Sequence, residues 1–389
     1  MRRFLPLLAL LISCSSAGSS GGAPPLGNGG SGGSTVVETG PLATGMAIGE
    51  VSINQGVKVK LYSAEEGDLA DLNAPIVQGR DALLRVFFAP KADWQPHRVA
   101  VRVTLQNGGG EPTVLEIQGV PSGPSNDEDI TTSANFDIPG TRLDGTLAVR
   151  VEMLDVEAGE GDTAGTTWPA EGERLFNEQS GNGAFQLKVI PIRYTAGGVD
   201  YEPDLSEDTL KGIRYDFLRQ YPISAVDLSV GDTLTWAQQV NANGNGWQQL
   251  LNKIVSLRDS DPSPNVYYFG LVKPAASTAS YCAGGCVAGL TYISKDSLDA
   301  SLRSSIGLAF GDVQNGTMLH ETGHAHRRTH APCGPYGQLP DQIDPKFPHP
   351  KGSIGVWGYD LLDRTLRSPA EYTDFMGYCE QTWVSDYTF

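Results

Sequence analysis

The stretch Val99-Ala100-Val101-Arg102-Val103-Thr104-Leu105, which is apolar at every second position, decides the fold of the first half of this chain. Leu147-Ala148-Val149-Arg150-Val151-Glu152-Met153 repeats the pattern. Because successive side chains of a strand point to opposite faces, this alternation predicts strands with one buried face. Clusters of Gly, Pro, Asn and Asp separate the runs, as in turns. Short strands at this spacing predict an all-β, sandwich-like domain over residues 46–157.

The pattern changes after residues 158–184, which we interpret as a connector. The continuous apolar run at 266–272 is typical of a buried strand, and 187–192 is expected to form another. Apolar side chains at helical spacing predict one helix capped by Ser206 and a second over 247–257. Strands alternating with helices indicate an α/β domain over residues 185–389. The fold class expected for the whole chain is therefore α+β.

The chain begins with an export signal. Arg2 and Arg3 precede a short apolar run, Phe4 to Ile12, which is too short to span a bilayer. The run ends in Leu11-Ile12-Ser13-Cys14, which resembles a bacterial lipobox and implies that Cys14 carries lipid. An ordinary secretory signal with an incidental Cys is the alternative. We interpret residues 1–14 as the signal and expect an exported protein, anchored by lipid at the bacterial envelope, at the outer membrane or cell surface.

Residues 15–45 are rich in Gly and Ser, so they cannot bury a core and are expected to form a flexible tether. The formal net charge of −17 argues against nucleic-acid binding, because such a chain repels phosphates. We interpret that charge as favouring solubility, and we expect a monomer.

Besides Cys14, the chain has four cysteines: Cys282, Cys286, Cys333 and Cys379. An even number in an exported protein favours disulfides, with three connectivities open from the spacing. A zinc site made of cysteines is disfavoured because there is no CxxC pair.

Four of the six histidines fall in the segment from His320 to His330. On a helix, His320 and His324 project from one face, and two neutral imidazoles at that spacing bind Zn²⁺. Glu321 follows the first ligand and is placed to accept a proton from a water molecule at the metal. On this motif alone, a helix with two surface histidines remains an alternative.

Two further features favour the metal site. His330 lies ten positions after His320, at the spacing of a third ligand in the extended motif HExxHxxGxxH. Met376, followed by Tyr378, occurs in a segment like the Met-turn of such enzymes. Three histidines leave one tetrahedral position open, which is typical of a catalytic rather than a structural zinc site.

On these motifs the segment from His320 onward resembles the metzincins, and especially a secreted bacterial group related to those that cut mucin-like glycoproteins. Further support comes from His330-Ala-Pro-Cys333-Gly, from Gly352-Ser-Ile-Gly-Val-Trp357-Gly-Tyr-Asp360, and from Trp383-Val-Ser-Asp-Tyr387. The resemblance implies a zinc endopeptidase with substrate in a cleft between two subdomains. It also implies that Tyr378 lies near the metal and donates a hydrogen bond to the tetrahedral intermediate.

The sequence departs from the family pattern in two places. Arg327 stands where the motif has Gly, and we expect it to adopt another turn, because a left-handed conformation costs a non-Gly residue roughly 1–2 kcal/mol. The chain ends soon after Met376, so the closing helix of the family is expected to be short or absent. His326 is expected to lie exposed on the opposite side of the helix from His324.

The resemblance also implies the disulfide pairing. In the metzincin arrangement the third ligand and the Met-turn both lie near the zinc, so Cys333 is expected to pair with Cys379. Cys282 then pairs with Cys286.

The function expected is a zinc-dependent endopeptidase acting on extracellular protein or glycoprotein substrates. Glu321 would be the general base, and Tyr378 would assist it. One alternative is a surface binding protein that retains zinc without turnover. Another is a metal-dependent amidase or esterase acting on cell-wall or glycan material.

Overall fold

The structure is a computed structural model that describes residues 40–156, 161–179, 183–293, 299–311, 313–334 and 342–389. It is a mixed α+β protein, as expected, with many strands and few helices. The predicted export signal, the predicted lipobox with Cys14 and most of the predicted tether lie outside the described residues. Among the described helices, none is long and apolar enough to cross a membrane.

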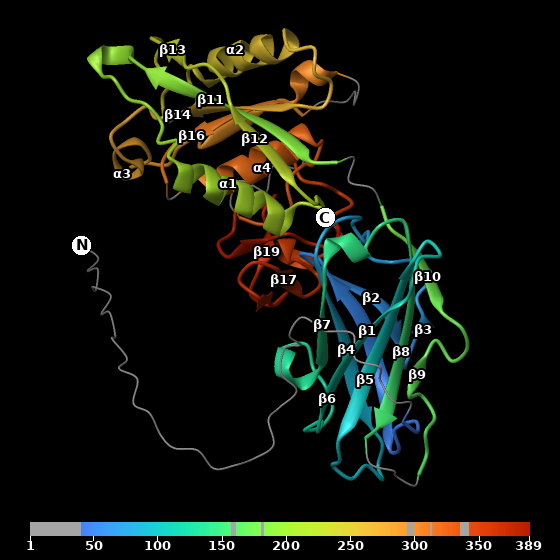
Figure 1. Cartoon of the computed structure of the whole chain (residues 1–389). Helices are drawn as coiled ribbons and strands as arrows, with labels where there is room; N and C mark the ends of the chain where they lie inside the picture. Colours follow the sequence, from blue (N-terminus) through green and yellow to red (C-terminus); the bar gives the residue numbers. More distant parts are fainter. Residues whose placement is uncertain (1–39, 157–160, 180–182, 294–298, 312, 335–341) are drawn as a thin grey trace, which may run out of the picture.

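Two antiparallel sheets lie face to face in what we call the N-terminal β region, residues 40–179 (Figure 1). The first sheet has the order β3-β2-β1-β4-β7, with β1 Met46–Asn54, β2 Lys58–Ser63, β3 Gly67–Asp68, β4 Ala82–Pro90 and β7 Ala134–Ile138. The second has the order β10-β8-β5-β6, with β5 Val99–Asn107, β6 Thr113–Gly119, β8 Thr146–Asp155 and β10 Arg174–Asn177; β9 Thr167–Trp168 pairs with β8. Val101, Val103 and Val151 are fully buried in the core that both sheets share.

The segment interpreted as a connector contributes to this region. Strands β9 and β10 lie within it, and both pair with β8. Trp168 of β9 is buried, and its indole Nε1 donates to Asp68. The end of the predicted tether is also packed: Ala43 is buried, and Thr44 N donates to the Asp155 carboxylate at 3.1 Å. Both segments pack because they carry apolar side chains within an otherwise polar stretch.

The region from 183 to 334 is built on a mainly parallel sheet with the order β12-β11-β14-β16-β15. Its strands are β11 Phe185–Tyr194, β12 Val226–Val230, β13 Leu234–Trp236 (paired with β11), β14 Tyr267–Val272, β15 Gly289–Thr291 and β16 Ser304–Leu308. Strand β15 is antiparallel to β16 at the sheet edge. The helices are α1 Glu207–Gln220, α2 Trp247–Asp259, α3 Thr278–Tyr281 and α4 Gln314–Ala325. Helix α2 covers one face of the sheet, and α1 and α4 cover the other (Figure 1).

The predicted helices form because their apolar side chains share one stripe. Ile213 and Phe217 of α1 are buried, as are Leu250 and Ile254 of α2. Ser206 occupies the N-cap position of α1, although its side chain makes no capping hydrogen bond. Short 3₁₀ turns connect other elements: η1 Ile130–Thr132, η2 Gly140–Arg142, η3 Ala196–Gly198, η4 Ala300–Leu302 and η5 Pro350–Gly352.

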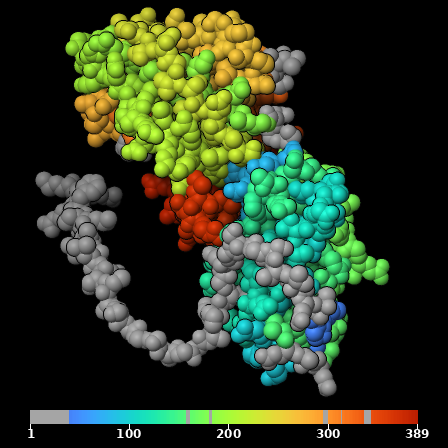
Figure 2. Space-filling model, in the orientation of Figure 1, coloured from blue at the N-terminus to red at the C-terminus, as the bar shows by residue number. Residues whose placement is uncertain are grey.

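The last part of the chain, residues 342–389, forms what we call the C-terminal lobe. It has only short strands: β17 Gly358–Asp360, β18 Thr365–Arg367, β19 Thr373–Asp374 and β20 Thr382–Trp383. No helix follows Met376 in the described residues, as expected. Instead the lobe packs against the N-terminal β region (Figure 2): the buried Trp383 donates from Nε1 to Gly56 O at 2.7 Å. This contact ties the C-terminal lobe to the N-terminal β region.

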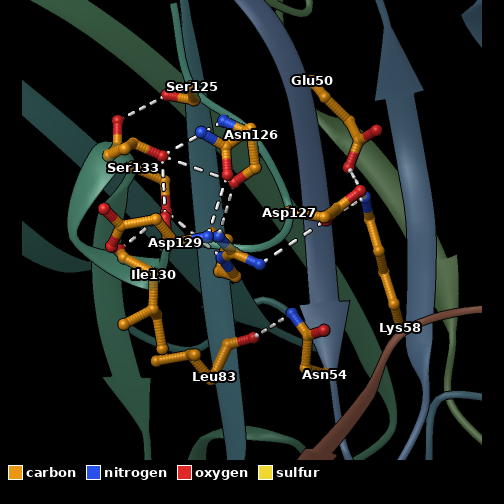
Figure 3. Close-up of polar contacts among 12 residues, drawn as sticks. Glu50, Asn54, Lys58, Leu83, Ser125, Asn126, Asp127, Asp129, Ile130 and Ser133 are labelled. Atoms are coloured by element: carbon orange, nitrogen blue, oxygen red, sulfur yellow. Dashed lines mark hydrogen bonds and ion pairs between the residues drawn. The ribbon is translucent and has the colours of Figure 1, made fainter. Parts of the chain in front are cut away.

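A charged network lies on the first sheet, beside the C-terminal lobe (Figure 3). Arg85 is fully buried, and its Nε donates to Ser133 Oγ at 3.1 Å. Lys58 Nζ lies 2.6 Å from Asp127 Oδ1 and 2.8 Å from Glu50 Oε1. The two cations, Lys58 and Arg85, are buried and pair with partly exposed carboxylates, so the network holds the loop that carries Asp127 against the sheet.

Candidate metal centre

Helix α4 and the turn after it bring together the three histidines that the sequence predicts as ligands. His320 and His324 are one turn apart on α4, and their ring centroids are 4.7 Å apart. His330 approaches from the segment after the helix, with its ring centroid 4.6 Å from that of His324. One ligand nitrogen from each residue lies within 4.8 Å of the others, so the three can hold one metal ion. The predicted triad is confirmed as a cluster.

The turn that delivers His330 corrects one expectation. Arg327 adopts the left-handed conformation, with φ of 71°, that we expected only a Gly to take. The chain nevertheless turns as in the Gly motif: Arg327 N donates to His324 O at 2.8 Å, and Arg328 N donates to Gly323 O at 3.0 Å. These bonds, together with the strand-like pairing of His330 with Ile343, offset the steric cost at Arg327.

The imidazole nitrogens are arranged as ligands of a metal require. His320 Nδ1 lies 2.8 Å from Phe375 O, and His324 Nδ1 lies 2.7 Å from Arg328 O, so both rings donate to carbonyls through Nδ1. Their Nε2 atoms are then left as acceptors, and His320 Nε2 is buried without a hydrogen-bond partner. Such outer hydrogen bonds orient metal-binding histidines.

Burial also keeps the triad in the form that binds metal. It lowers the pKa of His320 to about 4 and that of His324 to about 3, because desolvation penalises the charged imidazolium. The pKa of His330 is lowered for the same reason. Neutral imidazoles of this kind fit Zn²⁺, which accepts nitrogen ligands in a tetrahedral arrangement.

Glu321 is buried beside the triad, with 7% of its surface exposed. Burial raises the pKa of its carboxyl to about 8, because the charged form is desolvated. Gly289 of β15 makes room for it: a Cβ at that position would come within 2.6 Å of Glu321 Oε1. Sequence reasoning missed this requirement, since only the fold brings β15 beside α4.

The segment around Met376, which the sequence analysis interprets as a Met-turn, packs against α4. Met376 is buried, and a Cβ at Gly323 would overlap its Sδ atom. Asp374, which the sequence analysis did not single out, organises the turn. Its carboxylate accepts hydrogen bonds from Met376 N at 2.8 Å and from Ser385 N at 2.9 Å. The third ligand is tied to the same turn, because Ala331 N donates to Met376 O.

Tyr378 lies at the mouth of the cluster, where the sequence predicts it. Its hydroxyl is 2.7 Å from His330 Nε2, and 44% of the residue is exposed. Partial burial of the ring raises the pKa of the hydroxyl to about 12, so the group stays protonated and can donate.

Both predicted disulfides are confirmed. Cys333 pairs with Cys379 with a Cα–Cα distance of 5.6 Å, and Cys282 pairs with Cys286 at 4.8 Å. The first bridge joins the segment after His330 to the segment after the Met-turn. The second closes a small loop that lines the cleft described next.

A cleft of about 880 Å³ opens beside the cluster. His320, Glu321 and Tyr378 line one side, and the Cys282–Cys286 loop and Gly289 of β15 also contribute. No Lys, Arg or Asp belongs to its described lining, and Glu321 is its one carboxylate there. The cleft is therefore a mainly neutral space that reaches the triad.

The other histidines lie away from the cluster. His326 is exposed at a different cavity, as the helical geometry predicts. His349 lies 2.6 Å from Asp386, and His97 lies 2.6 Å from Asp155. Each therefore has a structural partner.

Comparisons with known proteins add little to this geometry. No protein-family model matches the chain, and no curated protein matches it. A solved structure to which it is similar, a Bacteroides fragilis protein described as a candidate β-galactosidase, shares 11% identity at a TM-score of 0.17. That alignment covers 57% of this chain and 39% of the other, and so low a score carries no argument about fold or activity.

Proposed function

We propose that this protein is a zinc-dependent endopeptidase of the metzincin type, with Zn²⁺ on His320, His324 and His330. The observation that carries the proposal is the convergence of three neutral imidazoles beside a buried carboxylate, Glu321, at a cleft. The packing of Met376 against α4 further supports the metzincin assignment.

Each residue has a distinct role in this proposal. When bound, Zn²⁺ supplies Lewis acidity that polarises a carbonyl and activates water. Glu321 accepts the proton of the attacking water and passes it to the leaving amine. Its raised pKa without metal suits a group that must hold a proton during turnover. The protonated Tyr378 hydroxyl donates to the developing oxyanion.

The cleft favours a peptide substrate. Strand β15 is the last strand of the sheet and contributes Gly289 to the cleft, so an extended segment can align along it as an added strand. The neutral lining favours uncharged residues around the scissile bond. We propose extracellular proteins or glycoproteins as substrates.

Metal analysis tests the site. The purified full-length protein is expected to hold about one Zn²⁺ per chain, whereas His320→Ala and His324→Ala lose most of it. His326→Gln is the matched control on the same segment, because its ring faces away from the triad; it keeps zinc. Equal zinc in all four proteins would disprove the assignment.

Turnover is tested with Glu321→Gln. The variant is expected to keep zinc but to lose activity by several orders of magnitude, because the amide cannot accept the proton. The measurement is proteome-wide identification of new peptide termini after incubation with each protein. New termini produced equally by both proteins would remove Glu321 from the mechanism.

The same assay separates the alternatives. A zinc-retaining binding protein gives no new termini with the wild-type protein either. An amidase acting on cell-wall or glycan material gives none from proteins but releases products from those polymers.

The proposal places the protein at the bacterial envelope through lipid on Cys14. Cys14→Ser is expected to shift the protein from the detergent phase to the aqueous phase in a partitioning assay. A variant that still partitions with detergent would show that the lipobox interpretation is wrong.

A further inference from the structure

A second cavity, of about 940 Å³, lies where the N-terminal β region meets the α/β region. Val77 comes from the first of these, and Tyr267, His326 and Arg328 come from the second. His326 and Gly323 reach it from the side of α4 that faces away from the triad. Cavities of this size at domain interfaces commonly bind small ligands. The proposed peptidase mechanism makes no use of it.

Aromatic rings form much of the cavity wall. His326 stacks on Tyr267, with ring centroids 4.5 Å apart and an interplanar angle of 11°. Phe185 lies 5.2 Å from Tyr267, and Tyr221 lies 5.7 Å from His326, also measured between centroids. A wall of this kind favours a planar or aromatic group on the ligand.

The charge of the cavity is opposite to that of the protein. Arg328 lines it, and its Nη2 donates to a neutral acceptor, Thr388 O, at 3.0 Å. No Asp or Glu side chain belongs to the described lining, although the chain has a net charge of −17. A guanidinium in such surroundings recognises a carboxylate.

Gln220 adds an unsatisfied hydrogen-bonding group. The residue is 8% exposed and lines the cavity, and its Oε1 atom is buried without a hydrogen-bond partner. Buried polar atoms of this kind are rare in folded proteins, because leaving them unpaired is costly. A ligand N–H at this position would satisfy the amide oxygen.

We propose that this cavity binds the C-terminal aromatic residue of a peptide. The ligand's carboxylate pairs with Arg328, its backbone N–H donates to Gln220 Oε1, and its ring packs on Tyr267 and His326. This site is separate from the proposed metal centre, and its ligand need not be a product of that centre.

The probe is N-acetyl-L-phenylalanine, which carries the carboxylate, the N–H and the ring. Titration of the purified full-length protein, followed by ligand-observed NMR, is expected to give a Kd on the order of 1 mM for a ligand of about 15 non-hydrogen atoms. N-acetyl-L-phenylalaninamide lacks the charge and N-acetylglycine lacks the ring, so each is expected to bind about tenfold more weakly. Equal binding of all three ligands, or none, would overturn the proposal.

Variants locate the site. Gln220→Leu and Arg328→Gln are each expected to weaken binding about tenfold, while Arg193→Gln, which removes a distant exposed charge, leaves it unchanged. Zinc content and the unfolding midpoint report whether each variant is folded. Unchanged affinity in folded Gln220→Leu and Arg328→Gln would disprove the proposal.

A cross-linking experiment on the wild-type protein shows where the ligand binds even if those variants fail to fold. N-acetyl-p-benzoylphenylalanine, activated by light on the wild-type protein, is expected to label peptides that contain Tyr267 or His326. Labelling confined to the peptide that contains Gly289 would assign the ligand to the cleft instead and overturn the proposal.

Discussion

Arg327 lies in the turn between α4 and the third histidine of the triad. Its φ of 71° is tolerated by Gly and, at a cost, by Arg, but is strongly disfavoured for a β-branched residue. We therefore expect Arg327→Val to lower zinc content together with stability, by about 2 kcal/mol or more. Arg327→Gly is the matched control and is expected to keep zinc, with a change in stability of about 1 kcal/mol or less. Full zinc content in Arg327→Val would show that the turn is not needed.

Glu178 makes stability depend on pH. Both of its carboxylate oxygens are buried, and burial raises its pKa from 4.5 to about 7, with a backbone hydrogen bond from Gly145 opposing the shift. A carboxyl with a raised pKa in the folded state binds its proton more tightly there than in the unfolded chain. The ionisation of Glu178 therefore lowers the stability of the folded protein as pH rises from 4.5 to about 7.

Because the residue is half-buried, we expect Glu178→Gln to stabilise the protein by only about 1 kcal/mol at pH 8 and to have little effect at pH 4. Urea unfolding at both pH values measures the difference. A stabilisation of equal size at both would exclude ionisation as the cause.

At the scale of elements, Asp374 holds the Met-turn in place. Asp374→Ala leaves the N–H groups of Met376 and Ser385 buried without an acceptor, at about 1–3 kcal/mol each. We therefore expect a loss of about 2–4 kcal/mol by urea unfolding, with weaker zinc retention, because the turn supports α4. Asp374→Asn keeps one acceptor oxygen, so its stability and zinc retention are expected to lie between those of the wild type and Asp374→Ala. A stable Ala variant with normal zinc would show that the packing of Met376 is sufficient.

The N-terminal β region acts on the candidate metal centre through Arg80, at the scale of the whole molecule. Buried Arg80 donates to Tyr221 O at 2.9 Å and to Ile223 O at 2.7 Å, just after the end of α1. Tyr221 in turn donates its hydroxyl to Leu319 O, in the helix that carries His320. These hydrogen bonds therefore link the N-terminal β region to α4, the helix that carries His320 and His324.

Arg80→Ala is expected to destabilise the protein by about 2–4 kcal/mol, because Ile223 O loses its side-chain donor, Tyr221 O keeps only the Ile223 N–H, and the packing of the buried side chain is lost. Arg364→Gln is the control: it breaks the Arg364–Asp137 pair, which joins the C-terminal lobe to the N-terminal β region and whose side chains are 43% and 46% exposed. Such a surface pair is expected to contribute less than about 1 kcal/mol. Thermal unfolding compares the two variants, and equal effects would show that burial of Arg80 is unimportant.

Local patterns in the sequence determined much of this protein. Period-two alternation predicted β5 and β8, and helical spacing predicted α1 and α2, because these signals lie within a few residues of one another. The spacing of His320, His324 and His330 predicted the histidine cluster for the same reason. The two disulfides followed from resemblance to a family.

Only the tertiary structure decided the remaining features, because they depend on contacts between segments far apart in the chain. Three features belong to this class. Gly289 leaves space for the Glu321 side chain, the Asp374 carboxylate accepts hydrogen bonds in the Met376 turn, and Arg80 donates to Tyr221 O. The turn at Arg327 belongs to it too, since steric preference alone predicted another conformation. A backbone strain of roughly 1–2 kcal/mol is small beside the packing and hydrogen bonds that the surrounding fold supplies, so the fold, and not the residue, set the position of His330.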